Sequence, residues 1–171
     1  MKINGKIWKL TPTSINAYMK CPREFYYRYK LKLKTKPSIH LVRGNIVHKA
    51  LERFFKLRLY ENVSDSFSAL KNATLNLFNE TWKDYSEELN KLNMPPQDID
   101  FYYDDSKKMV LNWLHTFLKE DPKELRPLTE LKLESNTHQV YAIVDIIKNS
   151  TGVPHIVDYK TSKSMELTDE Y

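Results

Sequence analysis

The sequence is poor in glycine, in cysteine and in long apolar segments. It has three glycines among 171 residues, which argues against a loop-rich or all-β architecture. Its single cysteine, Cys21, excludes an internal disulfide framework. No apolar run approaches the ~18 residues of a membrane span, and the N-terminus lacks the apolar core of a signal peptide. We therefore expect an intracellular, cytoplasmic protein without a membrane segment.

The charge is divided unevenly along the chain. Residues 1–60 hold 15 Lys and Arg against two acids, a balance of +13, whereas residues 61–171 hold 12 against 20 acids, a balance of −8. A basic segment next to an acidic one indicates a phosphate-binding face beside a separate acidic region. Solvated helix faces would give the same charge runs. The aromatic side chains of residues 25–29 fit base stacking and a packed core equally well.

Hydrophobic periodicity predicts a helical N-terminal half. Thr11 is expected to cap a first helix, and Pro22 to stand in the first turn of a second, which ends near Tyr29. Residues 30–40 form a basic connector, and further helices are expected over residues 41–60, 64–89 and 100–118. The apolar positions of the 41–60 helix recur at helical spacing and are Val47, Ala50, Leu51, Phe54 and Phe55.

The pattern changes after residue 127. Residues 128–133, 138–148 and 153–160 are rich in β-branched and apolar side chains and are separated by short turn segments. This pattern predicts a three-stranded antiparallel meander. The expected fold is therefore of the α/β class, with a helical N-terminal half packed on this meander.

Two carboxylates, Asp145 and Asp158, stand inside the most apolar of these strands. Aspartate is depleted from strands, and burying a carboxylate costs several kcal/mol unless something compensates. If the connecting turn centres on residues 151 and 152, the numbers of paired residues sum to 303, and the two aspartates lie directly opposite each other. Their Cβ atoms would then be about 4.5–5.5 Å apart. A register shift of one residue would place them on opposite faces.

Lys160 follows Asp158 by two residues, so strand alternation places it on the same face. Two carboxylates this close repel each other unless a cation lies between them, and oxygen ligands suit Mg²⁺ or Mn²⁺. A carboxylate pair with an adjacent ammonium fits the hydrolysis of phosphodiesters. The simpler alternative is a surface Asp–Lys pair on a solvated strand face.

His48 lies at the edge of the apolar stripe of the 41–60 helix, with Glu52 one turn later and Gly44 one turn earlier. A glycine inside a helix costs about 0.5–1 kcal/mol relative to alanine, so Gly44 predicts the close approach of another segment. Taken alone, His48 is more often a packing or surface residue than a ligand. The glycine and the two downstream aspartates favour the ligand here.

Five motifs follow one another along the chain. They are Ser14-Ile-x-x-Tyr18-x-x-Cys21-Pro22-x-x-Phe25-Tyr-x-x-Tyr29, Gly44-x-x-x-His48-x-x-Leu51-Glu52, Glu130, Ala142-Ile-Val-Asp145 and Ile156-Val-Asp158-Tyr-Lys160-Thr161. With these motifs the chain resembles the PD-(D/E)XK nuclease superfamily, and within it the RecB-like exonucleases and their CRISPR-associated relatives. The resemblance covers nearly the whole chain except about residues 61–125. It implies that the meander is part of a restriction-endonuclease-like αβββαβ core.

The resemblance also implies the composition of the site. His48, Asp145 and Asp158 would bind the metal together with the backbone carbonyl of Tyr159, and Lys160 would be catalytic. An imidazole among oxygen ligands favours Mn²⁺ somewhat over Mg²⁺. Two further acids, Glu130 and Glu52, are candidate accessory members of the site.

The chain departs from the family's pattern in three ways. Ala142 stands where the family usually has glycine. Some relatives hold an iron–sulfur cluster with one cysteine near position 21 and three near the C-terminus. This chain has Cys21 but none of the other three, so no cluster is expected from this chain alone. The sequence ends about where a helix with a Gln-x-x-x-Tyr motif would begin. We therefore expect residues 1–171 to form a single, incomplete domain, made of a basic helical segment (1–40), a helical region (41–125) and a catalytic meander (126–171).

These features together predict a metal-dependent DNA nuclease, an exonuclease or end-processing enzyme of DNA repair, recombination or CRISPR adaptation. The expected partners are DNA and either a helicase or other recombination or CRISPR protein, or a chain that supplies the missing C-terminal elements. The residues expected to contact DNA are Arg23, Arg28, Lys30, Arg43 and Gly44. One alternative is a non-catalytic DNA-binding module that retains the fold. Another is a structural protein in which Asp145 and Lys160 pair on the surface.

Overall fold

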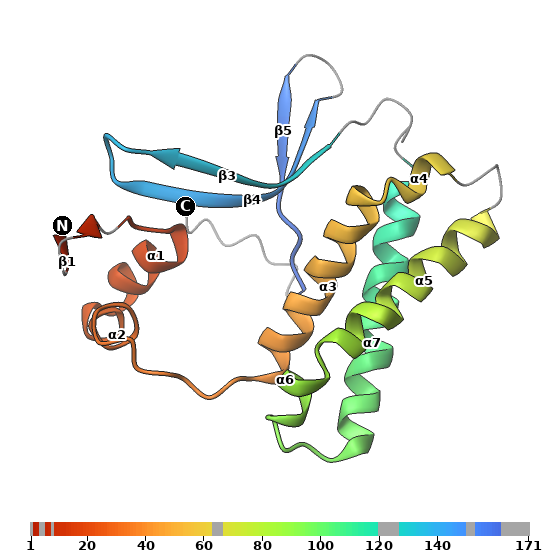
Figure 1. Ribbon diagram of the computed structural model, residues 1–171, viewed down its shortest axis with the longest axis horizontal. Helices are drawn as coiled ribbons and strands as arrows, with labels where there is room; N and C mark the ends of the chain where they lie inside the picture. The colour runs from red at the N-terminus through yellow and green to blue at the C-terminus, as the bar shows by residue number, and fades with distance from the viewer. Residues whose placement is uncertain are drawn as a thin grey trace.

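A computed structural model describes residues 2–3, 6–7, 9–62, 67–119, 127–149 and 153–161 (Figure 1). The helices are α1 (Pro12–Lys20), α2 (Pro22–Phe25), the π-helix η1 (Tyr26–Lys30), α3 (Ile39–Lys56), α4 (Leu59–Asn62), α5 (Phe67–Asp84), α6 (Ser86–Asn90) and α7 (Pro96–Phe117). The strands are β1 (Lys2–Ile3), β2 (Lys6–Ile7), β3 (Leu128–Ser135), β4 (Val140–Asn149) and β5 (Pro154–Val157). A helical N-terminal half followed by a three-stranded antiparallel sheet confirms the predicted fold class.

Helices α3, α5 and α7 lie side by side and form the core of the helical half (Figure 1). All five apolar positions predicted for the stripe of α3 are buried. Phe54 of α3, Phe78 of α5 and Leu114 of α7 have no exposed surface, and full burial of each such side chain stabilises the fold by roughly 1.5–3 kcal/mol. Ile146 of β4 joins Phe54 and Leu114 in one cluster, so the sheet and the helices share a core.

The sheet has the order β3-β4-β5, with β4 in the centre and both pairings antiparallel. Pairs of β4 and β5 run from Ile146↔Val157 to Asn149↔Pro154. Their numbers sum to 303, so the predicted register is confirmed. The turn on which that register was predicted, at residues 151 and 152, lies outside the described residues. The β3–β4 hairpin extends beyond β5 towards α1 and α2 (Figure 1).

The N-terminal helices are attached to the tip of this hairpin. Thr11 caps α1 as predicted, since its hydroxyl accepts a hydrogen bond from the Ser14 amide (3.1 Å) and the Ser14 hydroxyl accepts one from the Thr11 amide (2.8 Å). Leu10 forms a parallel bridge with Val140. Residues 31–38 contain no helix or strand and connect η1 to α3, as predicted for the basic connector.

Several boundaries differ from the sequence-based prediction. The helix predicted over residues 64–89 is two helices, because Tyr85 leaves the helical region (φ −97°, ψ 15°) between α5 and α6. Helix α7 begins at Pro96, four residues earlier than predicted, since proline is tolerated in a first turn. Strand β5 ends at Val157 rather than at Lys160. No helix among the described residues is long and apolar enough to cross a membrane.

Candidate active site

His48 of α3 and Asp145 of β4 meet at the junction of the helical half and the sheet. The His48 Nδ1 lies 3.3 Å from the Asp145 Oδ2, and the two side chains are 31% and 16% exposed. The same carboxylate oxygen accepts a hydrogen bond of 2.8 Å from the backbone amide of Tyr159. Asp145 therefore links three segments that are far apart in sequence, namely α3, β4 and the residues after β5.

Three acids follow one another in the topology of the sheet, and we call them the row of acids: Glu130 of β3, Asp145 of β4 and Asp158 directly after β5. The β3–β4 register runs on both sides of Glu130 and places this residue opposite Asp145. The last pair of β4 and β5 is Ile146↔Val157, and Asp158 is the first residue after it. Glu130 has a φ of 52°, a left-handed conformation that costs a non-glycine residue on the order of 1 kcal/mol. The backbone of β3 is thus irregular at the acid that joins this row.

Glu52 of α3 extends the acidic region. Its side chain is 10% exposed and binds Lys49 (2.7 Å) and Lys56. Burial tends to raise the pKa of the Glu52 carboxyl, but the two lysine ammoniums outweigh burial and hold that pKa below its usual value. A small hollow brings these groups together and is lined by His48, Leu51, Glu52, Phe55, Thr129, Glu130, Asp145, Ile146 and Tyr159.

The surroundings of Glu130 shift the pKa of its carboxyl. Desolvation raises the pKa of the Glu130 carboxyl, and the negative charges of Glu52 and Asp145 raise it further. An acid whose pKa is higher in the folded state than in the unfolded chain stabilises the fold at low pH, and this stability is lost as the pH rises through the raised pKa. The ionised form of Glu130 is therefore unfavourable for the fold, as expected of a group that a cation would stabilise.

The substitution Glu130→Gln is accordingly expected to stabilise the metal-free protein at neutral pH and to lose this advantage in acid. The gain should be less than about 1 kcal/mol, because the side chain is largely exposed and the charges are screened. Thermal unfolding in a chelator, measured from acidic to neutral pH, tests this. Glu134→Gln, a control on the same strand, removes an acid that binds two lysines and should not stabilise. If Glu130→Gln has the same melting temperature as the wild type at all pH values, the negative charges of Glu52 and Asp145 do not destabilise the ionised Glu130.

Asp158 and Lys160 lie beside the His48–Asp145 contact rather than within it. The Lys160 Nζ binds the Asp158 Oδ2 at 2.5 Å, with side chains 68% and 55% exposed. Strand alternation predicted that these two residues share a face, and they touch, although the chain has left the strand at Val157. Within the described parts of the chain, no group of three or more His, Cys, Asp or Glu side chains is close enough to hold a metal ion. Asp158 binds the ammonium of Lys160 instead.

The donor set nevertheless fits a divalent ion. An imidazole nitrogen and a carboxylate oxygen 3.3 Å apart have close to the ~3 Å separation of adjacent ligands on an octahedral ion with bonds of about 2.1 Å. The third predicted ligand, Asp158, directly follows the last paired residue of β5. The backbone carbonyl of Tyr159 stays a prediction, since the contact given for this backbone is its amide on Asp145.

Gly44 and Arg43 lie about one turn before His48 on α3 and contact the segment that follows β5. A Cβ atom on Gly44 would lie 3.2 Å from the Thr161 hydroxyl, so the close approach predicted from this glycine is confirmed. The Arg43 guanidinium is 2% exposed, pairs with Asp105 of α7 at 2.5 Å and donates to the Thr161 carbonyl at 3.2 Å. We call Arg43, Asp105 and Thr161 the Arg43 brace.

The predicted DNA contacts divide into two groups. Arg43 and Gly44 are buried, so the prediction that they contact DNA is wrong for these two residues; the approaching segment is part of the protein itself. Arg23, Arg28 and Lys30 are exposed. Arg28 binds Glu24 at 2.9 Å, a surface ion pair that costs little to exchange for a phosphate.

Sequence reasoning missed Lys49 and Asp105. Lys49 neutralises Glu52 next to the site, and its pKa is raised, first by the hydrogen bond to Glu52. The spacing of three residues between Lys49 and Glu52 on one helix was the available signal. Asp105 lies 62 residues from Arg43, and no sequence spacing indicates that pair.

Comparison with known proteins adds a family match. A family model described as the PD-(D/E)XK nuclease superfamily matches residues 9–170. The matched range begins before α1 and includes the row of acids, His48 and Lys160. No curated protein and no solved structure matches the chain.

Proposed function

Because the chain belongs to the PD-(D/E)XK nuclease superfamily, we propose that it hydrolyses phosphodiester bonds of DNA with Mg²⁺ or Mn²⁺. The observation that carries the proposal is the contact between His48 and Asp145. Glu130 lies opposite Asp145 on β3, and Asp158 directly follows β5. A helix, two strands and the segment after the third strand thus meet where the superfamily's chemistry needs oxygen and nitrogen ligands. The shared core of helices and sheet supports a single domain.

His48, Asp145 and Asp158 would hold the ion, with the Tyr159 carbonyl as a further ligand. When bound, the ion would supply Lewis-acid polarisation of the scissile phosphate. Asp145 has a second role, because its carboxylate fixes the Tyr159 amide and with it the segment that carries Lys160. Glu130 and Glu52 are not among these ligands. Together with Lys49 they would orient the ligand side chains and balance their charge.

Lys160 would act at the phosphate. Its ammonium is 68% exposed, so DNA can reach it. With Asp158 engaged as a ligand, the Lys160 ammonium would turn from Asp158 to the phosphate of the substrate. There a fixed positive charge stabilises the negative charge that develops in the transition state. The Arg43 brace anchors the next residue, Thr161.

The finer assignment follows the motifs. We propose a RecB-like or CRISPR-associated nuclease that removes or processes DNA ends in repair, recombination or CRISPR adaptation, beside a helicase or similar partner. The exposed Arg23, Arg28 and Lys30 would contact phosphates. Binding through such contacts weakens steeply with salt.

Replacement of Lys160 by alanine is expected to lower the cleavage rate by roughly 10²–10³-fold, the usual cost of losing one group that stabilises the transition state. Mn²⁺ binding should remain, because Lys160 is not a ligand. The measurement is cleavage of a plasmid and of an end-labelled linear duplex with Mg²⁺, with Mn²⁺ and with a chelator. Lys108→Ala, which removes an exposed lysine of α7, is the matched control.

The same assay separates the alternative of a non-catalytic module. The observation that favours this alternative is that Asp158 binds Lys160 and does not join His48 in a metal-binding group. DNA binding without cleavage under any metal would support that module and refute the nuclease. Cleavage that needs a divalent ion, starts at the labelled ends and vanishes in Lys160→Ala would support the exonuclease.

A further inference from the structure

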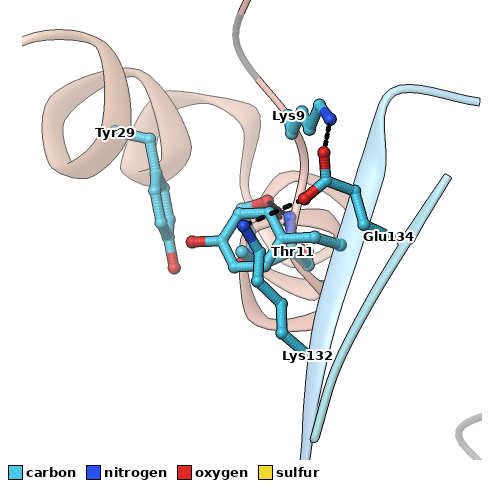
Figure 2. Close-up of a pocket in the computed structure, with 7 residues that line it drawn as sticks. Lys9, Thr11, Tyr29, Lys132 and Glu134 are labelled. Carbon is cyan, nitrogen blue, oxygen red and sulfur yellow. Dashed lines mark hydrogen bonds and ion pairs between the residues drawn. The ribbon is translucent and has the colours of Figure 1, made fainter. Parts of the chain in front are cut away.

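A second concave site lies between the N-terminal helices and the β3–β4 hairpin. It is an open cleft of about 450 Å³ lined by Lys9, Thr11, Ser14, Tyr29, Lys132, Glu134 and Tyr141. This volume lies in the range of roughly 300–1,000 Å³ typical of small-molecule and cofactor sites. Figure 2 shows Tyr29 facing the hairpin side chains across the cleft, with Lys9 and Lys132 approaching Glu134.

Main-chain bonds hold the two walls of the cleft together. The Leu10 amide donates to the Gln139 carbonyl (2.8 Å), and the Tyr141 amide donates to the Leu10 carbonyl (2.9 Å). On the helical wall, the Tyr29 ring stacks on Phe25 at 5.3 Å between centroids. The cleft is therefore formed before any ligand arrives, which lowers the entropy cost of binding.

The lining combines positive charge with aromatic rings. Lys9 and Lys132 both bind Glu134, the latter at 2.9 Å, which leaves a net charge of +1 on these three side chains. Lys132 also lies 5.0 Å from the centroid of the Tyr141 ring. Exposed ion pairs contribute at most about 1 kcal/mol, so an incoming phosphate can take the place of Glu134. Aromatic rings beside lysines are the surface on which nucleic-acid bases stack.

The cleft lies on the same strand as Glu130. Glu134 pairs with Tyr141, and alternation places Lys132 and Glu134 on one face of β3. Glu130 precedes Lys132 by two residues on this strand. Four residues of strand span about 13 Å, a length that a few nucleotides of a single strand cover. A strand cut at the acids can therefore reach the cleft.

We propose that this cleft binds an unpaired nucleotide of the DNA, a few nucleotides from the bond that is cut. That the ligand is DNA rests on the proposed function; the cleft adds that this DNA is single-stranded. A base inside a duplex has both faces covered by its neighbours, whereas an unpaired base offers a face to Tyr29 and its phosphate to Lys132. The hydroxyl-lined and charged floor does not fit an apolar ligand.

The test is fluorescence anisotropy in a chelator, so that no DNA is cut. The probes are a labelled single-stranded oligonucleotide and a blunt hairpin duplex with the same number of phosphates. The wild type is expected to bind the single strand more tightly. Tyr29→Ala should weaken single-strand binding about tenfold and change duplex binding by less than about twofold, while Tyr29→Phe should bind like the wild type.

Lys132→Ala provides a second variant with little risk to folding, because this side chain is 57% exposed. It should reduce the slope of log K against log salt for the single strand by about 0.7, and the Lys108→Ala control should not. Single-strand binding that is unchanged in both Tyr29→Ala and Lys132→Ala, or a preference for the duplex, would overturn the proposal. These outcomes do not depend on cleavage, so loss of the proposed nuclease activity would be seen separately in the Lys160→Ala assay.

Discussion

Asp145→Asn is expected to abolish detectable cleavage and to weaken Mn²⁺ binding by at least roughly a hundredfold, since even residues that only support a ligand are worth 10–100-fold in affinity. The asparagine oxygen can still accept the Tyr159 amide that Asp145 binds at 2.8 Å. The variant therefore loses the charge and keeps the tertiary contact. Calorimetric titration with Mn²⁺ and the end-labelled cleavage assay measure the two effects.

The matched control for this variant is Asp104→Asn, which removes an exposed acid of α7 and should change neither readout. Asp145→Asn should also keep the melting temperature of the metal-free protein, because no buried group loses its partner. If Asp145→Asn binds Mn²⁺ as tightly as the wild type, the His48–Asp145 contact is only structural and the proposed metal site is refuted.

Arg43→Met is expected to lower the free energy of unfolding by about 2–4 kcal/mol and to reduce cleavage as well. Removing one partner of a buried ion pair leaves the other charge unpaired, which costs about 3–5 kcal/mol. Two features reduce this cost, because Asp105 is 25% exposed and the Nε of Arg43 has no hydrogen-bond partner. Denaturant unfolding measures the stability. Cleavage at a temperature where the variant is folded measures the loss of the Thr161 anchor.

Two further variants separate stability from positioning in the Arg43 brace. Asp105→Asn combined with Arg43→Met removes both charges and should recover part of the stability but not the cleavage rate, because the bond to Thr161 stays lost. Arg43→Lys keeps one charge and loses the forked geometry that reaches Asp105 and Thr161 together. Full recovery of cleavage in the double variant would show that Arg43 acts through stability alone.

The register of the sheet was accessible from the sequence because its signal is local. The predicted turn between β4 and β5 set the pairing, and alternation then fixed which side chains share a face. The apolar stripe of α3 was equally clear and placed His48 at its edge. The sequence therefore predicted that a helix and two strands meet, and His48 lies 3.3 Å from Asp145.

What the sequence did not indicate depends on contacts between distant segments. Arg43 stands in the basic half of the chain, and its charge favoured the prediction of a DNA contact. Only the fold shows that this side chain pairs with Asp105. Lys9 and Glu134 are 125 residues apart, so the cleft that they line has no local pattern. The exposed ion pair of Asp158 with Lys160 is the surface pair that the sequence offered as the simpler alternative, and strand alternation alone could not distinguish it from a metal ligand.

The bridge between Leu10 and the hairpin tip is made by backbone groups alone. Any residue except proline can form these bonds, because they need only a backbone amide and a carbonyl. The helices α1, α2 and η1 are thus joined to the hairpin by main-chain groups, and the eight residues of the connector join them to α3. Side chains on the N-terminal surface can therefore be exchanged without breaking this attachment to the sheet.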